Sequence, residues 1–339
     1  MTTSGSRLPA PVPISQHRWP TGTKPLVSVL CTAYNHERFV RQAIEGFLSQ
    51  ETDFPVEIVL HDDASSDGTS SIIREYAGRY PSLIRAILQT ENQRSRGRWA
   101  IAMLMETTPS EYFAICEGDD YWTAADKLQS QIELLEQNPT ASACFHRGDG
   151  LFEESGRLIP GHFGPSVLKD SYDVDDLLVR DNFVPTHSVV LRSRSIAGFP
   201  QWLAEVPHCD IVLLCMLTLE GPLFYLDRSM GVYRKHSGGM HTGDPEIIQN
   251  VKVLITRLRL GYGLGVVDRD AFRSGIAYTV AAIEDKLERY ERRIAQLEAR
   301  HASDAATIQR IFASTTFRVG MTLSRLRHWV SRGVGAAGE

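Results

Sequence analysis

A run of apolar residues ends abruptly in carboxylates between residues 112 and 122, which read YFAICEGDDYW. Glu117, Asp119 and Asp120 lie within four positions of one another at this point. Carboxylates this close repel one another, and burying them without a partner costs free energy. Their oxygens are hard ligands that favour Mg2+ or Mn2+, an ion that usually keeps open positions for phosphate oxygens. The stretch therefore predicts a divalent cation site, with acids solvated on a loop as the alternative.

Two more polar clusters follow apolar, β-branched runs in the same way: TAYNHE at residues 32–37 and HDDASSDG at residues 61–68. Ligands of parallel sheets bind beyond the carboxyl ends of the strands, so we expect all three clusters to meet on one edge. Asp62 would accept hydrogen bonds there from a base or a ribose. For Ser65, Ser66 and Asp67, capping the next helix is the competing interpretation.

The elements that must position these clusters alternate between strands and helices. Strands are predicted at 26–34, 56–63, 84–89 and 112–117, and helices at 36–50, 65–80 and 98–107, the first of them capped by Asn35. This alternation predicts an α/β fold with a mostly parallel sheet flanked by helices. Beyond residue 143 the pattern is less regular, with a strand at 186–193, a helix at 208–221 and a strand pair at 223–239.

The motifs at 27–44 (VSVLCTAYNHERFVRQAI), 57–69 (EIVLHDDASSDGT) and 112–136 (YFAICEGDDYWTAADKLQSQIELLE) resemble the successive landmarks of family 2 glycosyltransferases with the GT-A fold. The resemblance is close over residues 25–138 and continues more loosely to residue 239. Its nearest form is that of bacterial enzymes that build polysaccharides and surface glycans. It implies a Rossmann-like GT-A sheet, a nucleoside-diphosphate sugar donor and a bound Mn2+ or Mg2+ ion.

The resemblance also assigns expected roles to residues of the donor site. Thr32, Tyr34 and Glu37 would line the nucleotide pocket, and Asp62 would hold the base with Asp63 close by. Glu117-Gly118-Asp119 occupies the family's Asp-x-Asp position. Asp119 is the expected metal ligand, and Glu117 and Asp120 are expected to contact the donor; Glu117 departs from the more usual Asp.

Two later motifs supply the expected base and diphosphate clamp. Asp210, at the start of the helix 208–221, matches the family's general base, although Cys209 before it departs from the usual residue. A carboxylate that serves the helix dipole is the alternative for Asp210, and His208 is a second candidate base. His236 is expected to be a further metal ligand and Arg234 to pair with phosphate oxygens, against the alternative of an ordinary basic loop.

The expected reaction is an inverting, metal-dependent transfer of a sugar to a hydroxyl of a glycan or lipid-linked acceptor, with a uridine diphosphate donor favoured. A cation that bridges the diphosphate oxygens stabilises the charge that develops on the leaving group. A sugar nucleotidyltransferase is one alternative, although residues 32–39 lack its Gly-rich basic phosphate loop. A non-catalytic scaffold is the other.

The overall composition of the chain indicates which kinds of partner and which cellular location to expect. The chain has 339 residues, 42% of them hydrophobic, and a net charge of −5, which argues against a nucleic-acid partner. None of the five cysteines forms a CxxC pair, so they predict buried thiols rather than a zinc site. With no signal peptide and no apolar window long enough to span a membrane, the expected location is the cytoplasm.

Three regions are expected: a disordered leader at 1–24, a GT-A domain at 25–245 and a helical region at 246–339. The helical region carries a short heptad seam at Ile283, Leu287, Tyr290, Ile294 and Leu297, suited either to packing on the domain or to a homo-oligomer. Its end, 308–332, is basic, amphipathic and free of acids. That tail suits the inner face of an anionic membrane, or a helix packed on the protein itself.

Overall fold

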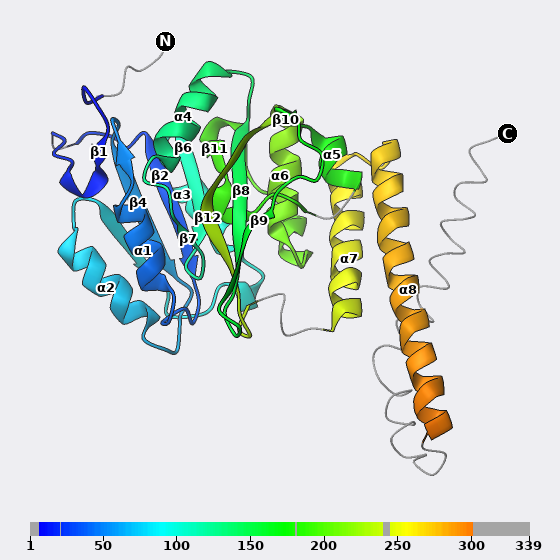
Figure 1. Cartoon of the computed structure of the whole chain (residues 1–339). Coiled ribbons are helices and arrows are strands. Elements are labelled where there is room, and N and C mark those ends of the chain that lie inside the picture. The colour runs from blue at the N-terminus through cyan, green and yellow to red at the C-terminus, as the bar shows by residue number, and fades with distance from the viewer. Residues whose placement is uncertain (1–6, 21, 180–181, 240–244, 301–339) are drawn as a thin grey trace.

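A computed structural model describes residues 7–20, 22–179, 182–239 and 245–300 (Figure 1). The strands are β1 (Val12–Pro13), β2 (Val27–Ala33), β3 (Glu51–Thr52), β4 (Val56–Asp62), β5 (Ile84–Leu88), β6 (Tyr112–Glu117), β7 (Tyr121–Trp122), β8 (Ala143–Phe152), β9 (Arg157–Phe163), β10 (Ser171–Tyr172), β11 (Val190–Arg192) and β12 (Leu223–Lys235). The helices are α1 (Val40–Leu48), α2 (Thr69–Arg79), α3 (Ala100–Thr107), α4 (Lys127–Gln137), α5 (Val174–Val179), α6 (Cys209–Glu220), α7 (Glu246–Leu264) and α8 (Asp270–Arg300). Short 3-10 turns include η2 (Arg94–Arg96), η3 (Thr186–Ser188) and η5 (Gln201–Glu205).

The central sheet has ten strands, eight of them in the order β10-β12-β8-β11-β6-β2-β4-β5, while β7 pairs with β12 and β9 with β8. Strands β6, β2, β4 and β5 run parallel, as the alternation of strands and helices predicts. Beyond β6 the sheet is mixed, because β11 runs antiparallel to both β6 and β8 whereas β12 runs parallel to β8. The predicted α/β class with helices on both faces is confirmed, and the parallel arrangement holds for its N-terminal half.

The segment 223–239 differs from the expected strand pair. It forms one long strand, β12, which pairs with β8 along its length through two register shifts. Its other edge pairs with β10 at one end and with β7 at the other. The shifts break the period-two alternation that identifies a strand in sequence, which is why the segment reads as two pieces.

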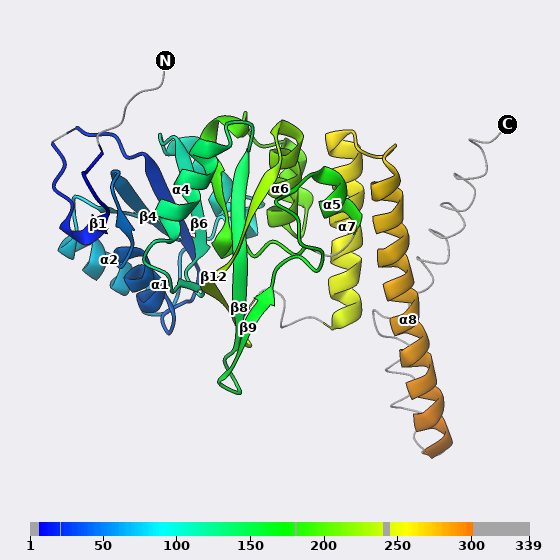
Figure 2. The same ribbon diagram turned by 45° about the horizontal axis from the view of Figure 1, so that its top comes forward.

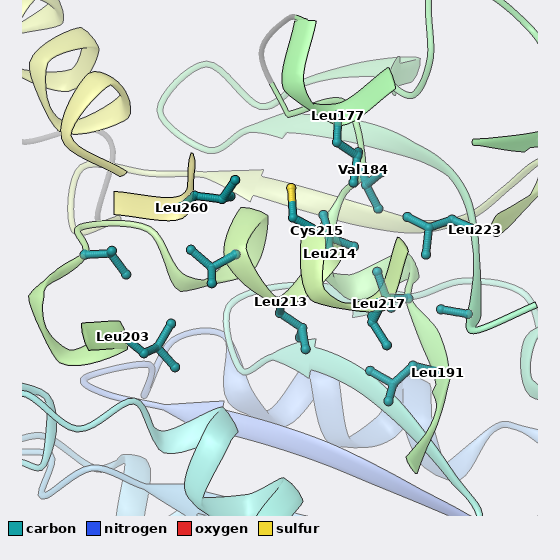
Figure 3. Packing of buried hydrophobic residues seen from close by; sticks show 14 of the residues in the cluster. Leu177, Val184, Leu191, Leu203, Leu213, Leu214, Cys215, Leu217, Leu223 and Leu260 are labelled. Carbon is teal, nitrogen blue, oxygen red and sulfur yellow. The ribbon is translucent and has the colours of Figure 1, made fainter. Parts of the chain in front are cut away.

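Two apolar clusters cover the two faces of the sheet. Successive residues of a strand point to opposite faces, so Val29 packs with α1 and α4 whereas Leu30 packs with α3 and α6. Figure 3 shows the second cluster, in which leucines of α6 lie among Leu191 and Leu223 of the sheet and Leu260 of α7. Burial of each such side chain contributes roughly 1.5–3 kcal/mol, which anchors α6 and therefore its first turn.

The N-terminal segment is more ordered than its composition suggests. Although a disordered leader is expected through residue 24, the structure packs residues 7–20 onto the domain. β1 pairs antiparallel with β3, and Ile14 is only 1% exposed. Arg7 forms an ion pair with Asp53 at 2.6 Å. A few local contacts of this kind produce no hydrophobic periodicity in a Pro-rich stretch. The sequence pattern therefore could not predict that this segment is ordered.

Helices α7 and α8 form a layer at the end of the molecule, with α8 reaching beyond the sheet (Figures 1 and 2). Gly275 lets α8 approach α5 closely, because a Cβ atom there would collide with the carbonyl oxygen of Leu178. Of the heptad residues, Ile283 is fully buried, whereas Tyr290 is 41% exposed. The start of the seam thus packs on the domain.

The basic tail at 308–332 lies outside the described residues. Within the described ranges, no helix combines the length and the apolar character needed to cross a membrane.

Candidate active site

The ends of β2, β4 and β6 lie level with one another in the sheet. Thr32 pairs in register with His61 of β4 on one side and with Glu117 of β6 on the other. Just past the strands, Gly118 N donates to Thr32 O at 2.9 Å and Asp63 N donates to Ala33 O at 2.9 Å. The three polar clusters therefore share one edge of the sheet.

The loop after β2 is tied to the loop after β4 by side chain-to-backbone hydrogen bonds. Asn35 has a left-handed backbone with φ of 56°, and its Oδ1 accepts a hydrogen bond from Ser66 N at 2.9 Å. Glu37 Oε2 accepts one from Gly68 N at 3.0 Å. A Cβ atom at Gly68 would lie 2.5 Å from Glu37 Oε1, so a larger residue there would displace the Glu37 carboxylate. Asn35 thus binds the neighbouring loop instead of capping α1, which begins at Val40.

Asp62 and Asp63 both hold backbone at the end of β4. Asp62, 2% exposed, accepts hydrogen bonds from Ser65 N at 3.2 Å and from Ser65 Oγ. Asp63 accepts hydrogen bonds from Gln93 N at 2.7 Å and from Arg94 N at 3.1 Å. Asp63 therefore fixes the turn η2, a role that its position in the sequence did not reveal.

Of the remaining nucleotide-pocket candidates, Tyr34 is 48% exposed at the rim and Thr32 is half-buried.

Asp119 lies between two histidines. Its Oδ2 is 3.1 Å from His236 Nε2 and 3.5 Å from His36 Nε2. Burial tends to raise the pKa of Asp119, but the hydrogen bond from His236 and the charge of His36 bring it below its ordinary value. Burial lowers the pKa of His36, against the charge of Asp119, which raises it. His36 belongs to the cluster 32–37 but carried no expected role.

Glu117 is buried and one of its carboxylate oxygens, Oε2, has no hydrogen-bond partner. Burial, and then the charges of Asp120 and Asp119, hold the pKa of Glu117 well above its usual range. The charge of Asp210, in the first turn of α6, raises it further. Asp210 itself is half-buried and accepts a hydrogen bond from Asn182 Nδ2 at 3.0 Å.

Asp120 is 2% exposed, and both of its carboxylate oxygens lie close to groups of the protein. Oδ1 accepts a hydrogen bond from Arg234 N at 2.8 Å. Oδ2 lies 3.3 Å from His187 Nδ1, without the geometry of a hydrogen bond. Burial and the charge of Asp119 raise the pKa of Asp120 well above its usual range. Asp120 therefore links the turn at residues 117–120 to β12.

Arg234 is likewise engaged by the protein. Its Nε donates to Asp119 O at 2.8 Å, Nη1 to Glu153 Oε2 at 2.6 Å and Nη2 to Gln42 Oε1 at 2.6 Å. The guanidinium also packs over the Phe39 ring. Because each nitrogen of the Arg234 guanidinium has a partner, this side chain links β12 and α1 to the turn at residues 117–120, here called the acidic turn.

Behind the turn lies Lys127, a fully buried amine that the sequence gave no reason to single out. Its Nζ donates to Gln131 Oε1 at 2.7 Å and lies 4.1 Å from the centre of the Trp122 ring. Burial lowers the pKa of Lys127 to about 7.

The residues fit a divalent cation that takes most of its ligands from substrate and water. Within the described part of the chain, no group of three or more His, Cys, Asp and Glu side chains is arranged to hold a metal ion. Asp119 and His236 nevertheless face one another, and Glu117 Oε2 beside them has no partner. Mg2+ is usually held by one or two carboxylates together with substrate phosphates and waters. Asp119 and His236 would be the residues that hold such a cation.

Comparisons with known proteins agree with the resemblance seen in the sequence. Residues 28–187 match the family model "Glycosyl transferase family 2". A protein of Mycobacterium tuberculosis, described as uncharacterized, is 37% identical over 214 residues, which is 63% of this chain and 60% of the relative. An uncharacterized glycosyltransferase of Nostoc, alr2836, is 26% identical over 263 residues, covering 71% of this chain and 78% of the relative.

Solved structures share the fold. The mannosyltransferase PcManGT of Pyrobaculum calidifontis, in complex with GDP-Man and Mn2+, aligns with a TM-score of 0.55 at 17% identity and covers 96% of this chain and 92% of its own. TarS 1–349 of S. aureus, in complex with UDP-GlcNAc, aligns with a TM-score of 0.52 at 16% identity, over 78% of this chain and 72% of its own.

These solved structures share the GT-A fold with this chain. The match to glycosyl transferase family 2 covers residues 28–187. The alignment spans less than two thirds of the mycobacterial relative, 60% of its length.

Proposed function

We propose that the protein is an inverting, Mn2+- or Mg2+-dependent glycosyltransferase. It moves a sugar from a nucleoside-diphosphate sugar to a hydroxyl of a glycan or lipid-linked acceptor in a bacterial surface glycan. The observation that carries this proposal is the contact of Asp119 with His236, 117 positions apart in the chain, at the edge where β2 and β4 end. Neighbours with the same fold bind UDP-GlcNAc, or GDP-Man with Mn2+, which supports a donor of this class.

Each part of the site has a task in this reaction. Tyr34 and the loops after β2 and β4 form the nucleotide pocket, and Asp62 lies where a base or ribose would meet it. Asp119 and His236 would hold the cation, which would supply positive charge to the departing diphosphate. Arg234 and Asp120 keep the acidic turn in place from behind.

Asp210 is the base of this mechanism. As the acceptor oxygen bonds to the anomeric carbon, the bond from that carbon to the diphosphate oxygen breaks on the opposite side. The hydroxyl proton passes to the carboxylate of Asp210. The position of Asp210 in the first turn of α6, a helix anchored by its buried apolar residues, supports this assignment. A positioned base contributes about 10²–10⁴-fold to the rate.

The first test is a screen of nucleotide sugars for slow donor hydrolysis, with and without Mn2+. Asp119→Asn is expected to reduce metal-dependent turnover by roughly 10²–10³-fold, because several kcal/mol of charge stabilisation is lost. The matched control is Asp227→Asn, an exposed carboxylate paired with Arg147. Unchanged turnover in Asp119→Asn would remove the site assignment.

The second test separates donor binding from transfer. Asp210→Asn is expected to bind the donor with unchanged affinity and to lose transfer by about 10²–10⁴-fold. Normal transfer by this variant would place the base elsewhere.

A cytoplasmic location, contact of the tail 308–332 with a membrane surface and assembly through α8 also remain predictions. Vesicle co-sedimentation and light scattering of the full chain test the last two.

A further inference from the structure

His187 is a fully buried histidine to which the proposed function gives no task. It belongs to the turn η3 and is 0% exposed. Its backbone is tied to β7, the strand that follows the acidic turn, because Trp122 Nε1 donates to His187 O at 2.8 Å. Gln131 Nε2 of α4 donates to the next carbonyl oxygen, Ser188 O, also at 2.8 Å. These two bonds fix η3 against the elements that carry the acidic turn.

Two glycines make room for the imidazole ring of His187. A Cβ atom at Gly148 of β8 would lie 3.0 Å from His187 Cε1, and one at Gly231 of β12 would lie 2.7 Å from His187 Cδ2. Gly231 pairs in register with Trp122, so the same stretch of β12 contacts both β7 and the ring. The ring therefore packs directly on the backbone of β8 and β12, where a side chain on either strand would displace it.

The polar atoms of this ring are poorly satisfied. Neither nitrogen has a hydrogen-bond partner among the described residues. Nδ1 lies 3.3 Å from Asp120 Oδ2, and the backbone of Gly231 is another polar neighbour of the ring. Burial, and then the charge of Lys127, lower the pKa of His187 to about 3, so the imidazole is neutral. A buried polar group without a partner costs free energy, so packing alone does not account for a histidine at this place.

Asp120 is already held through its other oxygen. Arg234 N of β12 donates to Asp120 Oδ1 at 2.8 Å, while Oδ2 faces His187. Bonds of the N–H···O type are about 2.7–3.2 Å long, so the ring and the carboxyl group are close to bonding distance. Contacts of this kind are often long in a site without ligand and tighten when the ligand binds. Asp120 therefore lies between two elements that can fix its orientation, β12 and η3.

We propose that His187 is a positioning residue for the acidic turn. Its Nδ1 orients the carboxyl group of Asp120, and Asp120 keeps the adjacent Asp119 aligned with His236. The inference rests on the proposed function for the cation that Asp119 and His236 would hold. Partners one step removed from a metal ligand typically contribute about 10–100-fold to metal affinity or activity, which is the size of effect expected of His187.

Two amide side chains separate this task from the filling of space. The amide group of an asparagine reaches the position of the imidazole Nδ1, whereas that of a glutamine reaches further, to the position of Nε2. His187→Asn therefore keeps a polar atom beside Asp120, and His187→Gln removes it although it fills more of the space. An asparagine can turn either its NH2 group or its carbonyl oxygen towards Asp120, so the variant serves either tautomer of the histidine.

The test measures binding of Mn2+ alone to the full chain, with the free ion followed by electron paramagnetic resonance. His187→Gln is expected to bind Mn2+ about 10–100-fold more weakly, and His187→Asn to keep most of the affinity. The matched control is His146→Gln, expected to leave the affinity unchanged. His146 is likewise fully buried, its ring centre lies 5.9 Å from that of His187, and its Nδ1 is 2.7 Å from Arg147 O.

Three results would overturn the proposal. They are unchanged affinity in His187→Gln, a loss in His187→Asn at least as large as that in His187→Gln, and an equal loss in His146→Gln. The second is the order that a space-filling residue predicts, because glutamine is closer to histidine in volume. Melting temperatures within about 4 °C of the unaltered chain show that the variants fold. If His187→Gln falls outside this range, His187→Ala, which also removes Nδ1, takes its place.

Urea unfolding without metal keeps this inference apart from the proposed function. If the unaltered chain binds no Mn2+ and hydrolyses no nucleotide sugar, the proposed function fails, and the contact between His187 and Asp120 is decided by a double-mutant cycle. The shifts in unfolding midpoint caused by His187→Gln and by Asp120→Asn are expected not to add in the double variant, since each removes the same contact. Additive shifts would show that the two side chains act independently and would overturn the positioning contact.

Discussion

The two sides of the candidate active site use their polar side chains differently. On the side formed by the loops after β2 and β4, the carboxylates of Glu37 and Asp63 accept hydrogen bonds from backbone N–H groups of neighbouring turns. On the side formed by the turn after β6, Glu117 Oε2 has no hydrogen-bond partner among the described residues.

This difference indicates how the site divides its work. Polar groups that satisfy one another hold loops in a fixed shape, whereas buried groups with spare bonding capacity cost free energy until a ligand supplies the partner. The first side should therefore determine stability, and the second should determine ligand binding and turnover. Substitutions on each side test that division.

The largest expected effect is on turnover, at Glu117. In Glu117→Gln, a neutral side chain of the same shape replaces a carboxyl group whose pKa is already well above its usual range. The melting temperature should stay the same or rise, while donor turnover falls by up to about a hundredfold through the loss of a carboxylate beside the cation. Differential scanning fluorimetry and a hydrolysis assay measure the two. A variant that melts earlier but turns over normally would reverse the proposed division.

A smaller effect, on stability, is expected on the other side. In Asp63→Ala the N–H groups of Gln93 and Arg94 lose their acceptors, which costs about 2 kcal/mol or more and lowers the melting temperature by several degrees. Asp175→Ala removes an exposed ion pair with Arg269 and is the control, expected to cost under about 1 kcal/mol. Equal losses in urea unfolding would show that Asp63 contributes no more than a surface carboxylate.

A third effect, on stability, concerns Lys127 beneath the turn at residues 117–120 and depends on pH. Lys127 has a pKa of about 7 when folded and 10.5 when unfolded. Between these values the unfolded chain binds a proton that the folded chain lacks, so its contribution to stability rises with pH, by about 1.4 kcal/mol per unit. Lys127→Met removes this contribution.

Urea unfolding at pH 7, 8 and 9 should therefore show the unaltered chain gaining stability relative to Lys127→Met. The exposed Lys24→Met serves as the control. Parallel curves for the unaltered chain and Lys127→Met would show that the amine titrates alike in both states.

The parts of the fold and site that sequence patterns predict are the local ones. Strands β2, β4 and β6 show as apolar runs that end in polar clusters, and parallel pairing brings Thr32, Asp62 and Glu117 to one edge. The orientation of Asp120 and Arg234 was beyond prediction, because it depends on the pairing of β12 with β7, more than a hundred positions away. The buried amine of Lys127 was also missed, since a lysine near a helix start normally indicates a solvated surface.

The glycine at position 275 has a consequence for the shape of the whole molecule. Gly275 allows the backbone of α8 to pack against the carbonyl oxygen of Leu178 in α5. This contact lies near the start of α8 and therefore helps to set the direction in which the helix extends from the domain. A methyl group at position 275 would push α8 away from α5 and change the tilt of the helix. The displacement would be largest at the far end of α8 and would not involve the sheet edge. The direction in which α8 extends from the domain therefore depends on the absence of a side chain at position 275.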